Sequence, residues 1–135
     1  MLVITVGPLG FRARLERDKA PRTCEALLKR LPLEAKLKQA RWSGESAWVP
    51  LGDLDFGLTH ENANTYPGAG ELLLYPGGLS ETEILFPYGA TSFASRMGPL
   101  AGNHFATIEE GRELLAEVGR LVMEEGAQDI RIEEG

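Results

Sequence analysis

The fold class is decided by the stretch Leu2-Val-Ile-Thr-Val-Gly-Pro-Leu-Gly-Phe-Arg-Ala-Arg-Leu-Glu16. Its first five residues are an apolar, partly β-branched run, which predicts a strand, and Gly7–Gly10 predict a turn. From Phe11 to Glu16, apolar and charged residues alternate, and this period of two is typical of a strand with one buried face. The stretch therefore predicts a β-hairpin near the start of the sequence.

The same alternation, or a short apolar run, returns in five later segments. These predicted strands cover residues 33–42, 47–49, 71–75, 83–88 and 129–133. Residues 51–70 show no period and contain many turn formers, so we expect a long irregular loop there. The glycine content also favours a β-rich protein, because 16 of the 135 residues are glycine, against a usual share of about 7%.

Two segments instead follow the helical period, in which apolar residues recur every three or four positions. The first covers residues 18–31 and has Pro21 in its first turn, where the missing N–H group is harmless. The second is predicted to begin at Thr107, because Thr107 and Glu110 form the pattern of a capping box. Gly126 follows its last apolar residues and predicts its end.

A largely antiparallel sheet of this size has to protect its edges from pairing with other chains, and closing into a barrel does so. The two amphipathic helices lie near opposite ends of the sequence and are suited to cover the two open ends of a barrel. A chain of 135 residues has the size of one domain. We therefore predict a mainly β protein with a single domain over residues 1–135. Its expected architecture is a closed β-barrel of about eight strands with two α-helices covering the ends.

Composition and charge restrict the function classes. No apolar run approaches the roughly 20 residues that span a bilayer, so no membrane partner is expected. The sequence shows no secretory leader and has one cysteine, Cys24, which fits a cytoplasmic protein. Residues 1–41 carry ten Lys and Arg against four Asp and Glu, whereas residues 42–135 carry four against sixteen. Because the acidic excess is the larger one, we expect these charges to mix on one surface and expect no nucleic-acid partner.

Three segments resemble cyclophilins. Lys19-Ala-Pro-Arg-Thr-Cys-Glu-Ala-Leu-Leu28 resembles their first helix, which follows a β-hairpin in the same way. Gly102-Asn-His-Phe-Ala-Thr-Ile-Glu-Glu-Gly111 resembles the segment that leads into their second helix, and Asp129-Ile-Arg-Ile132 resembles their closing strand. The resemblance covers nearly the whole chain and implies a cyclophilin-like barrel.

The likeness is closer to a bacterial family of uncharacterised proteins with a cyclophilin-like fold. Its members are similar at Arg41–Glu45, Glu61–Ala63, Tyr66–Pro67, Tyr75–Gly77, Glu81–Glu83, Tyr88–Gly89 and Gly98–Ile108. This resemblance implies a domain of unknown function, a fold without an established activity. Related folds occur in bacterial enzymes that open urea-like and lactam compounds, and for function this is analogy at the level of the fold only.

The resemblance to cyclophilins does not extend to their catalytic motif. Cyclophilins place a catalytic arginine on a strand before Phe-x-x-Gln-Gly-Gly-Asp, and the corresponding stretch, Ala40–Pro50, contains no Gln-Gly-Gly. Arg41 is the only arginine in that stretch. His104, in contrast, matches the position of the histidine that lines the cyclophilin pocket. We therefore do not expect prolyl isomerase activity, but we do expect His104 to belong to a site.

Five polar residues are candidates for ligand binding. Asn103 and His104 lie between a glycine-rich loop and a predicted strand, and a histidine titrates near neutral pH, as a general base requires. Arg96 precedes the same loop, and its planar guanidinium group suits a carboxylate, a carbonyl or a urea-like group. His60 and Asn62 lie in the irregular loop. Each has a purely structural alternative, namely hydrogen bonds that order a loop or, for Arg96, a surface ion pair.

Acidic and aromatic residues supply further candidates. Glu83 suits a general acid or base, although Glu81 and Glu83 together also fit a solvated strand end. Trp42 and Trp48 are candidates to line the ligand cleft, and we select Trp42 as a binding residue, although aromatic residues commonly fill a barrel interior or an oligomer interface instead. The two histidines have no metal-ligand spacing, and we find no phosphate loop or nucleophile motif. We therefore predict no metal site and no cofactor.

The favoured interpretation is a cytoplasmic cyclophilin-like barrel that binds a small polar metabolite in an accessory or regulatory role. The binding site is expected in one groove near Arg96, Asn103, His104 and the loop His60–Asn64. The first alternative is a hydrolase or isomerase acting on an amide or lactam-type substrate, with His104 or Glu83 as catalytic base. The second alternative is a structural homo-oligomer without a ligand. A homo-oligomer is expected in any case, because exposed aromatic residues often pair between copies of a small barrel.

Overall fold

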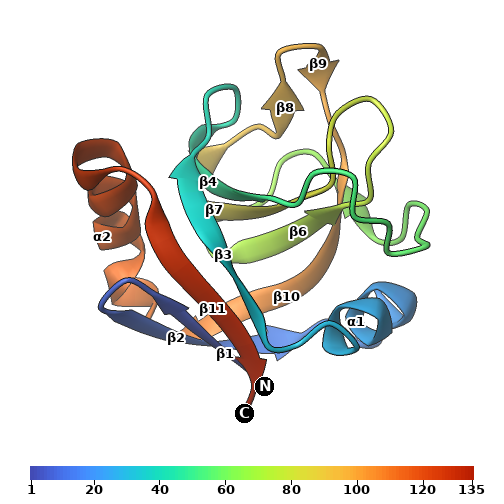
Figure 1. Ribbon diagram of the computed structural model, residues 1–135, viewed down its shortest axis with the longest axis horizontal. Helices are drawn as coiled ribbons and strands as arrows, with labels where there is room; N and C mark the ends of the chain where they lie inside the picture. Colours follow the sequence, from blue (N-terminus) through green and yellow to red (C-terminus); the bar gives the residue numbers. More distant parts are fainter.

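The computed structural model describes all residues, 1–135, and its centre is a closed barrel of eight antiparallel strands (Figure 1). The barrel strands are β1 (Leu2–Val6), β2 (Leu9–Leu15), β3 (Leu33–Gln39), β4 (Gly44–Pro50), β6 (Glu71–Tyr75), β7 (Glu83–Thr91), β10 (Gly102–Glu110) and β11 (Gln128–Glu134). Around the barrel they follow the order β2, β1, β11, β3, β4, β7, β6 and β10, and β10 pairs with β2 to close the ring. The predicted fold class is confirmed.

Three short strands lie in the loops. β5 (Ala63–Asn64) pairs with β10, while β8 (Ala94–Ser95) and β9 (Gly98–Pro99) pair only with each other. β5 is the only regular element within residues 51–70, which confirms the long irregular loop predicted there.

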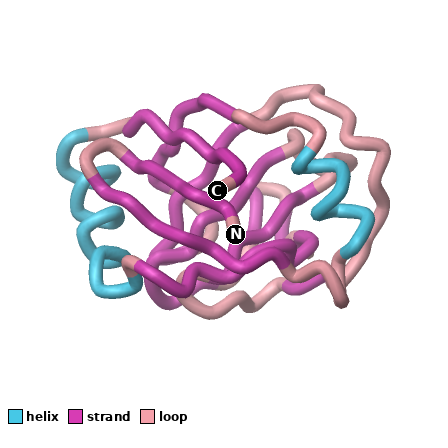
Figure 2. Tube along the Cα trace, turned by 90° about the horizontal axis from the view of Figure 1, so that it is seen from below, coloured by secondary structure: helices cyan, strands magenta, loops and turns pink.

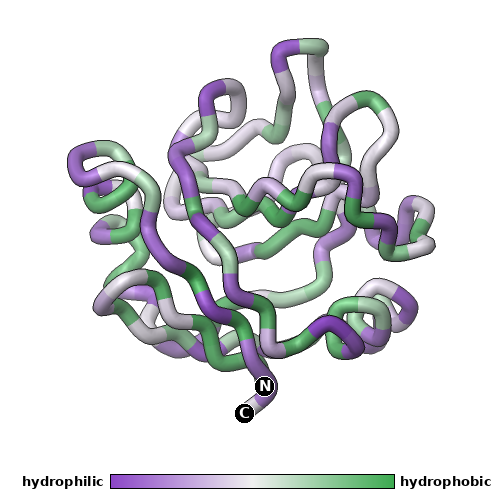
Figure 3. The backbone as a smooth tube through the Cα atoms, in the orientation of Figure 1, coloured by the Kyte–Doolittle hydropathy of each residue, from purple (hydrophilic) through white to green (hydrophobic).

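The hairpin predicted for residues 2–16 is confirmed. β1 and β2 pair in antiparallel fashion, with Ile4 opposite Phe11 and Val6 opposite Leu9. Ile4 and Phe11 are buried in the barrel, whereas Arg12 on the opposite face of β2 forms a surface ion pair. Figure 3 shows the same alternation of hydrophobic and hydrophilic residues along other strands. The period of two in the sequence therefore determines which side chains fill the barrel.

The barrel interior holds one large hydrophobic cluster to which every barrel strand contributes. Phe11 of β2 and Phe86 of β7 meet edge to face across it, with ring centroids 5.8 Å apart. Cys24 and Leu27 from the first helix and Val118 from the second helical segment complete the cluster. Cys24 is thus a core residue.

The two helical segments lie on opposite sides of the barrel (Figure 2). The first is α1 (Pro21–Leu28), which begins at the proline predicted for its first turn. The second is continuous and comprises η1 (Arg112–Leu114), α2 (Leu115–Arg120) and η2 (Leu121–Glu125). No helix in the structure has both the length and the apolar character needed to cross a bilayer.

The predicted start of the second helix at Thr107 is wrong, because β10 continues through Glu110. Thr107 pairs with both β2 and β6, so the ladder that closes the barrel outweighs the local capping pattern. The chain turns at Gly111, whose φ of 94° lies in the left-handed region that favours glycine. The helical segment follows directly, from Arg112.

β6 and β7 are buried on both faces. Their outward-facing side chains Leu73, Tyr75 and Leu85 form a second, smaller cluster with Phe93 and Leu100. The rings of Tyr75 and Phe93 meet edge to face at 5.9 Å. Phe93 and Leu100 belong to the segment that carries β8 and β9, so this segment covers the outer face of β6 and β7. The cleft described below lies beside this cover.

Tyr88 and Gly119 show how closely the second helical segment packs on the barrel. A Cβ atom at Gly119 would overlap the Tyr88 ring. We expect Gly119→Ala to lower the free energy of unfolding by about 1–3 kcal/mol, whereas alanine ordinarily stabilises a helix by about 1 kcal/mol relative to glycine. Denaturant unfolding measures the change. In a Tyr88→Ala background the same substitution should become stabilising, and a loss that persists there would contradict this packing.

Candidate functional site

A cleft of about 450 Å³ lies on the outer face of the barrel, and we call it the Glu83 cleft. Its walls come from β3 and the following turn, from β4, from the start of β7 and from β8. The lining residues are Lys38, Gln39, Ala40, Arg41, Trp42, Ser43, Trp48, Ser80, Glu83, Ala94, Ser95 and Arg96. They include three cations, two tryptophans and one acid.

Strand geometry directs three side chains into the Glu83 cleft. The neighbours of Trp48 in β4 belong to the interior cluster, so Trp48 itself points outward. Trp48 lies opposite Lys38 of β3 and Leu85 of β7, and paired residues project from the same face of a sheet. Glu83 precedes Leu85 by two residues and therefore shares this outer face.

The cations of the cleft have no partner within the protein. The side chains of Lys38, Arg41 and Arg96 are exposed and line the cleft, and they form no ion pair and no hydrogen bond within the protein. Elsewhere on the surface, Arg14 and Arg120 each bind at least two carboxylates. Because Glu83 is the only acid in the lining, the cleft has an excess of positive charge that favours an anion.

Glu83 is largely buried, with an exposed fraction of 6%, and its carboxyl group forms no hydrogen bond or ion pair within the protein. Its oxygens keep a small contact with solvent, because Ser46 Oγ is the only fully buried side-chain polar atom without a partner. Burial, and to a smaller extent the charge of Glu81, raise the pKa of Glu83 to about 8. At neutral pH the carboxyl group is therefore mainly protonated and offers an O–H donor. Glu81 lies before β7, is exposed, and accepts a hydrogen bond from the Gly52 N–H at 3.0 Å. Only Glu81 thus fits a solvated strand end.

The turn between β3 and β4 forms one wall of the cleft. Trp42 in this turn is 54% exposed. The next residue, Ser43, is buried, and its Oγ donates to the Ala94 carbonyl and accepts from the Ala94 N–H, both at 3.1 Å. These two bonds fasten the turn to β8. They hold the segment that carries Arg41 next to the segment that carries Arg96.

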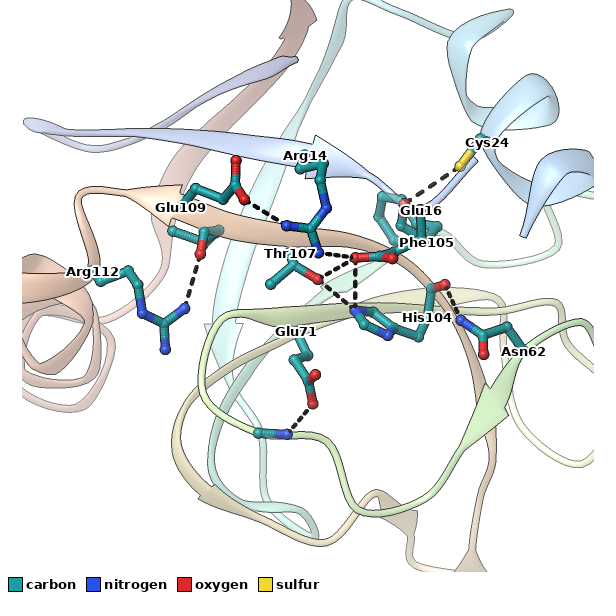
Figure 4. A network of polar contacts seen from close by, with 12 residues as sticks. Arg14, Glu16, Cys24, Asn62, Glu71, His104, Phe105, Thr107, Glu109 and Arg112 are labelled. Atoms are coloured by element: carbon teal, nitrogen blue, oxygen red, sulfur yellow. Dashed lines mark hydrogen bonds and ion pairs between the residues drawn. The ribbon is translucent and has the colours of Figure 1, made fainter. Parts of the chain in front are cut away.

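His104 belongs to a separate polar network on the outside of β10 and β2 (Figure 4). The Thr107 hydroxyl donates to Glu16 at 2.7 Å and lies 2.8 Å from His104 Nε2. Because the single hydroxyl proton of Thr107 goes to Glu16, His104 donates its Nε2–H to the Thr107 hydroxyl oxygen. Burial would raise the pKa of Glu16, but the bonds from Thr107 and Arg14 outweigh it and lower the pKa. The network links the two strands that close the barrel.

Asn103 is fully buried and joins β10 to the irregular loop and to α1. Its Oδ1 accepts from the Glu61 N–H at 3.0 Å. Its amide group donates to the Thr59 carbonyl at 2.9 Å and to the Thr23 hydroxyl at 3.2 Å. Both N–H groups of the side chain are therefore used inside the protein.

Glu61 and Asn62 continue this junction. Glu61 accepts hydrogen bonds from the backbone N–H groups of Arg22 and Thr23, at the first turn of α1. Burial would raise the pKa of Glu61, but these bonds and those from the Thr23 and Arg22 side chains outweigh it and lower the pKa. Asn62 donates to the His104 carbonyl at 2.9 Å and has a left-handed φ of 51°. The loop is thus anchored to the helix and to β10.

The structure therefore places the predicted site residues in two groups. Three of them line the Glu83 cleft: Trp42, Glu83 and Arg96. Three others lie where β10 meets the irregular loop: Asn62, Asn103 and His104. His60 is exposed in that loop and has no hydrogen-bond partner. No group of three or more His, Cys, Asp or Glu side chains comes together in a way that could hold a metal ion.

Sequence reasoning did not select Lys38 or Ser43 for the cleft, considered Trp48 beside Trp42 as a residue that lines it, and considered Arg41 only for its likeness to the cyclophilin arginine. The alternation in β3 and β4 places Lys38 and Trp48 on outward-facing positions, so a signal for these two was present. No local signal shows that Ser43 bonds Ala94, because the two residues lie far apart in the sequence.

The bonds of Asn103 predict a large structural effect. We expect Asn103→Ala to lower the free energy of unfolding by roughly 2–4 kcal/mol, because it leaves buried partners without hydrogen bonds. Denaturant unfolding measures this. The matched control is Asn64→Ala, which removes one exposed bond to the Tyr66 N–H and should cost less than about 1 kcal/mol. Equal losses in the two variants would show that water replaces the Asn103 bonds.

The raised pKa of Glu83 predicts pH-dependent stability. As the pH rises from about 4.5 to about 8, the unfolded chain releases the Glu83 proton while the folded chain retains it, so the wild type loses stability. Glu83→Gln removes this effect, and we expect the variant to gain on the wild type by at most about 5 kcal/mol above pH 8 and by little at pH 4. Unfolding experiments across this range, with the exposed Glu113→Gln as control, measure the difference. A difference independent of pH would rule out the raised pKa.

Comparisons with known proteins agree with this fold. A search of curated proteins finds no significant sequence match. McbB, solved in complex with tryptophan, is similar in structure with a TM-score of 0.76 and 19% identity over 99% of this chain, but the chain spans only 44% of McbB. The hypothetical protein AF2241 from Archaeoglobus fulgidus has a TM-score of 0.65 and 17% identity over 99% of this chain and 93% of its own length. Because the DUF3830 model, a protein family of unknown function, matches residues 2–134, the chain belongs to that family.

Proposed function

We propose that the protein is a cyclophilin-like barrel that binds a small polar metabolite in the Glu83 cleft and serves an accessory or regulatory role. One observation carries the proposal: three cations without partners and one buried carboxyl group without a partner line the same cleft. Buried polar groups are ordinarily paired within a protein, and the Glu83 carboxyl group is not. Lys38, Arg41 and Arg96 are exposed to solvent, and together they make the cleft electropositive. A ligand with complementary groups would supply the missing partners.

The size and lining of the cleft support the same proposal. Its volume of about 450 Å³ lies within the usual range of small-molecule sites. Trp42 and Trp48 offer aromatic surface beside the charged groups, a combination that suits a polar molecule with an apolar part. The similar barrel of McbB was solved with tryptophan, which is consistent with a small-molecule site on this kind of fold.

Binding assays with substituted proteins test the proposal. A panel of small polar metabolites should raise the melting temperature, and a ligand at 100 times its dissociation constant adds about 2.7 kcal/mol to the stability. Calorimetry should then show that Trp42→Ala and Arg96→Ala weaken binding of each hit by tenfold or more, about 1.4 kcal/mol. His104→Ala, outside the cleft, should leave the affinity unchanged. Loss of binding in His104→Ala alone would move the site to the β10 network.

The raised pKa of Glu83 favours a second candidate function, a hydrolase or isomerase acting on an amide or lactam-type substrate. A carboxyl group with a pKa of about 8 is close to the protonation balance that a general acid or base needs near neutral pH. The other candidate base, His104, donates its Nε2–H to Thr107 and retains Nδ1 for a substrate. Turnover of an amide or lactam that is lost in Glu83→Gln and kept in His104→Ala would assign Glu83 as the base. The reverse pattern would assign His104.

A further inference from the structure

We infer that the ligand of the Glu83 cleft is a small carboxylate that carries a flat ring with a neutral hydrogen-bond acceptor. The inference rests on the proposed function and names the chemical class of the ligand. In this arrangement the guanidinium groups of Arg41 and Arg96 bind the carboxylate, the ring lies against Trp42, and Glu83 donates to the acceptor.

The charge of the cleft selects an anion. Lys38, Arg41 and Arg96 approach from β3, from the turn after it and from the segment after β8, and no acid in the protein neutralises them. A neutral Glu83 leaves this positive charge uncompensated. A cationic ligand would meet repulsion from all three groups, whereas an anion would gain from each of them.

The backbone around the cleft favours a carboxylate over a phosphate. Two of the three cations are arginines, whose planar forks bind either anion through two parallel hydrogen bonds, so the arginines alone do not decide between them. Phosphate sites are typically built on a glycine-rich loop or a helix N-terminus that points N–H groups at the anion. The lining contains no glycine, and neither helical segment contributes to it.

The aromatic wall favours a flat ring. Trp42 is 54% exposed although it borders the cleft, so much of its surface is free to stack on a ligand. Ser43, next to Trp42, is fastened to β8 because its hydroxyl group bonds both the N–H and the carbonyl of Ala94. The backbone at the tryptophan is therefore held in place before a ligand binds, which lowers the ordering cost of binding.

Glu83 supplies the third contact. It lies on the outer face of β7, opposite Pro50 of β4 and Tyr75 of β6, and neither neighbour offers its side chain as a partner. Tyr75 directs its hydroxyl to the Leu79 and Ser80 N–H groups instead. A buried carboxyl group kept neutral is a hydrogen-bond donor, so the ligand atom facing it has to be an acceptor such as a carbonyl oxygen or a ring nitrogen.

A series of matched probes tests the ligand class by calorimetry on the unsubstituted chain. Benzoate, benzamide and benzylamine share a ring and differ in charge, while cyclohexanecarboxylate lacks the flat ring and phenyl phosphate changes the anion. Nicotinate adds a ring nitrogen to benzoate. We expect benzoate to bind at least about tenfold more tightly than benzamide, benzylamine, cyclohexanecarboxylate and phenyl phosphate, and nicotinate to bind more tightly than benzoate.

Substitutions locate the contacts. Arg41→Ala and Arg96→Ala should each weaken benzoate by about tenfold and leave benzamide unchanged, whereas Arg17→Ala, an exposed arginine outside the cleft, should change neither. Glu83→Leu should remove the advantage of nicotinate over benzoate. Folding of each variant is checked by thermal unfolding before binding is measured.

The possible failures are distinguishable. If benzamide, benzylamine or phenyl phosphate binds more tightly than benzoate, the inferred ligand class is overturned. If Trp42→Ala abolishes that binding, the cleft still stands as a binding site. Binding of benzoate that Arg17→Ala weakens as much as Arg96→Ala would overturn the class as well, because general surface charge would then explain it. Absence of binding by every probe and by the metabolite panel would overturn both this inference and the proposed function.

Discussion

The pairing of β2 with β10 joins two strands that lie far apart in the sequence, and the remaining structure depends on it. Leu15 lies opposite Ala106, and the Glu16 N–H donates to the Phe105 carbonyl at 2.8 Å just beyond this pair. The closed ring leaves no long edge open to other chains and buries one face of every barrel strand. On the outside of the same seam, Thr107 bridges Glu16 and His104. The polar network around the histidine is thus a consequence of closure, and it stabilises the strand pair that produces it.

The outer face of the barrel is covered in one part and open in another. The segment that carries β8 and β9 packs Phe93 and Leu100 onto β6 and β7. The adjacent outer face of β3 and β4 lies beyond this cover, and Ser43 fastens the neighbouring turn to the edge of it. The Glu83 cleft is the hollow between the covering segment and the outer face of β3 and β4. Trp48 packs against the outer cluster and also lines the cleft.

The fold was accessible from the sequence because its signals are local and redundant. Alternation in the hairpin and in the later strands, together with the helical stripe around Cys24, is enough to predict a β-barrel with two helices. The capping pattern at Thr107 failed since a nonlocal ladder competes with it. The predicted site residues fall into two groups for a related reason. Arg96 and His104 were predicted to share one groove, but their contacts depend on segments that are distant in the sequence: Arg96 lines the cleft, and His104 bonds Thr107 on β10. Sequence patterns identified Trp42 and Glu83 but carried no information on the contact between Ser43 and Ala94.

The buried carboxyl group is the feature of the cleft that the fold alone does not explain. The interior cluster needs Ile84 and Phe86 on one face of β7, and the outer cluster needs Leu85 on the other, but neither needs an acid at Glu83. Burial without a partner holds Glu83 neutral at a cost in stability that grows as the pH rises toward its pKa of about 8. A nonpolar residue there would avoid that cost and fill the same space. Strongly shifted titratable groups in clefts are characteristic of functional sites. A ligand that accepts a hydrogen bond from the Glu83 carboxyl group would give this group a partner and offset the cost of burying it. The anionic group of the same ligand would bind the arginines. Ligand binding and protein stability should therefore be coupled through Glu83.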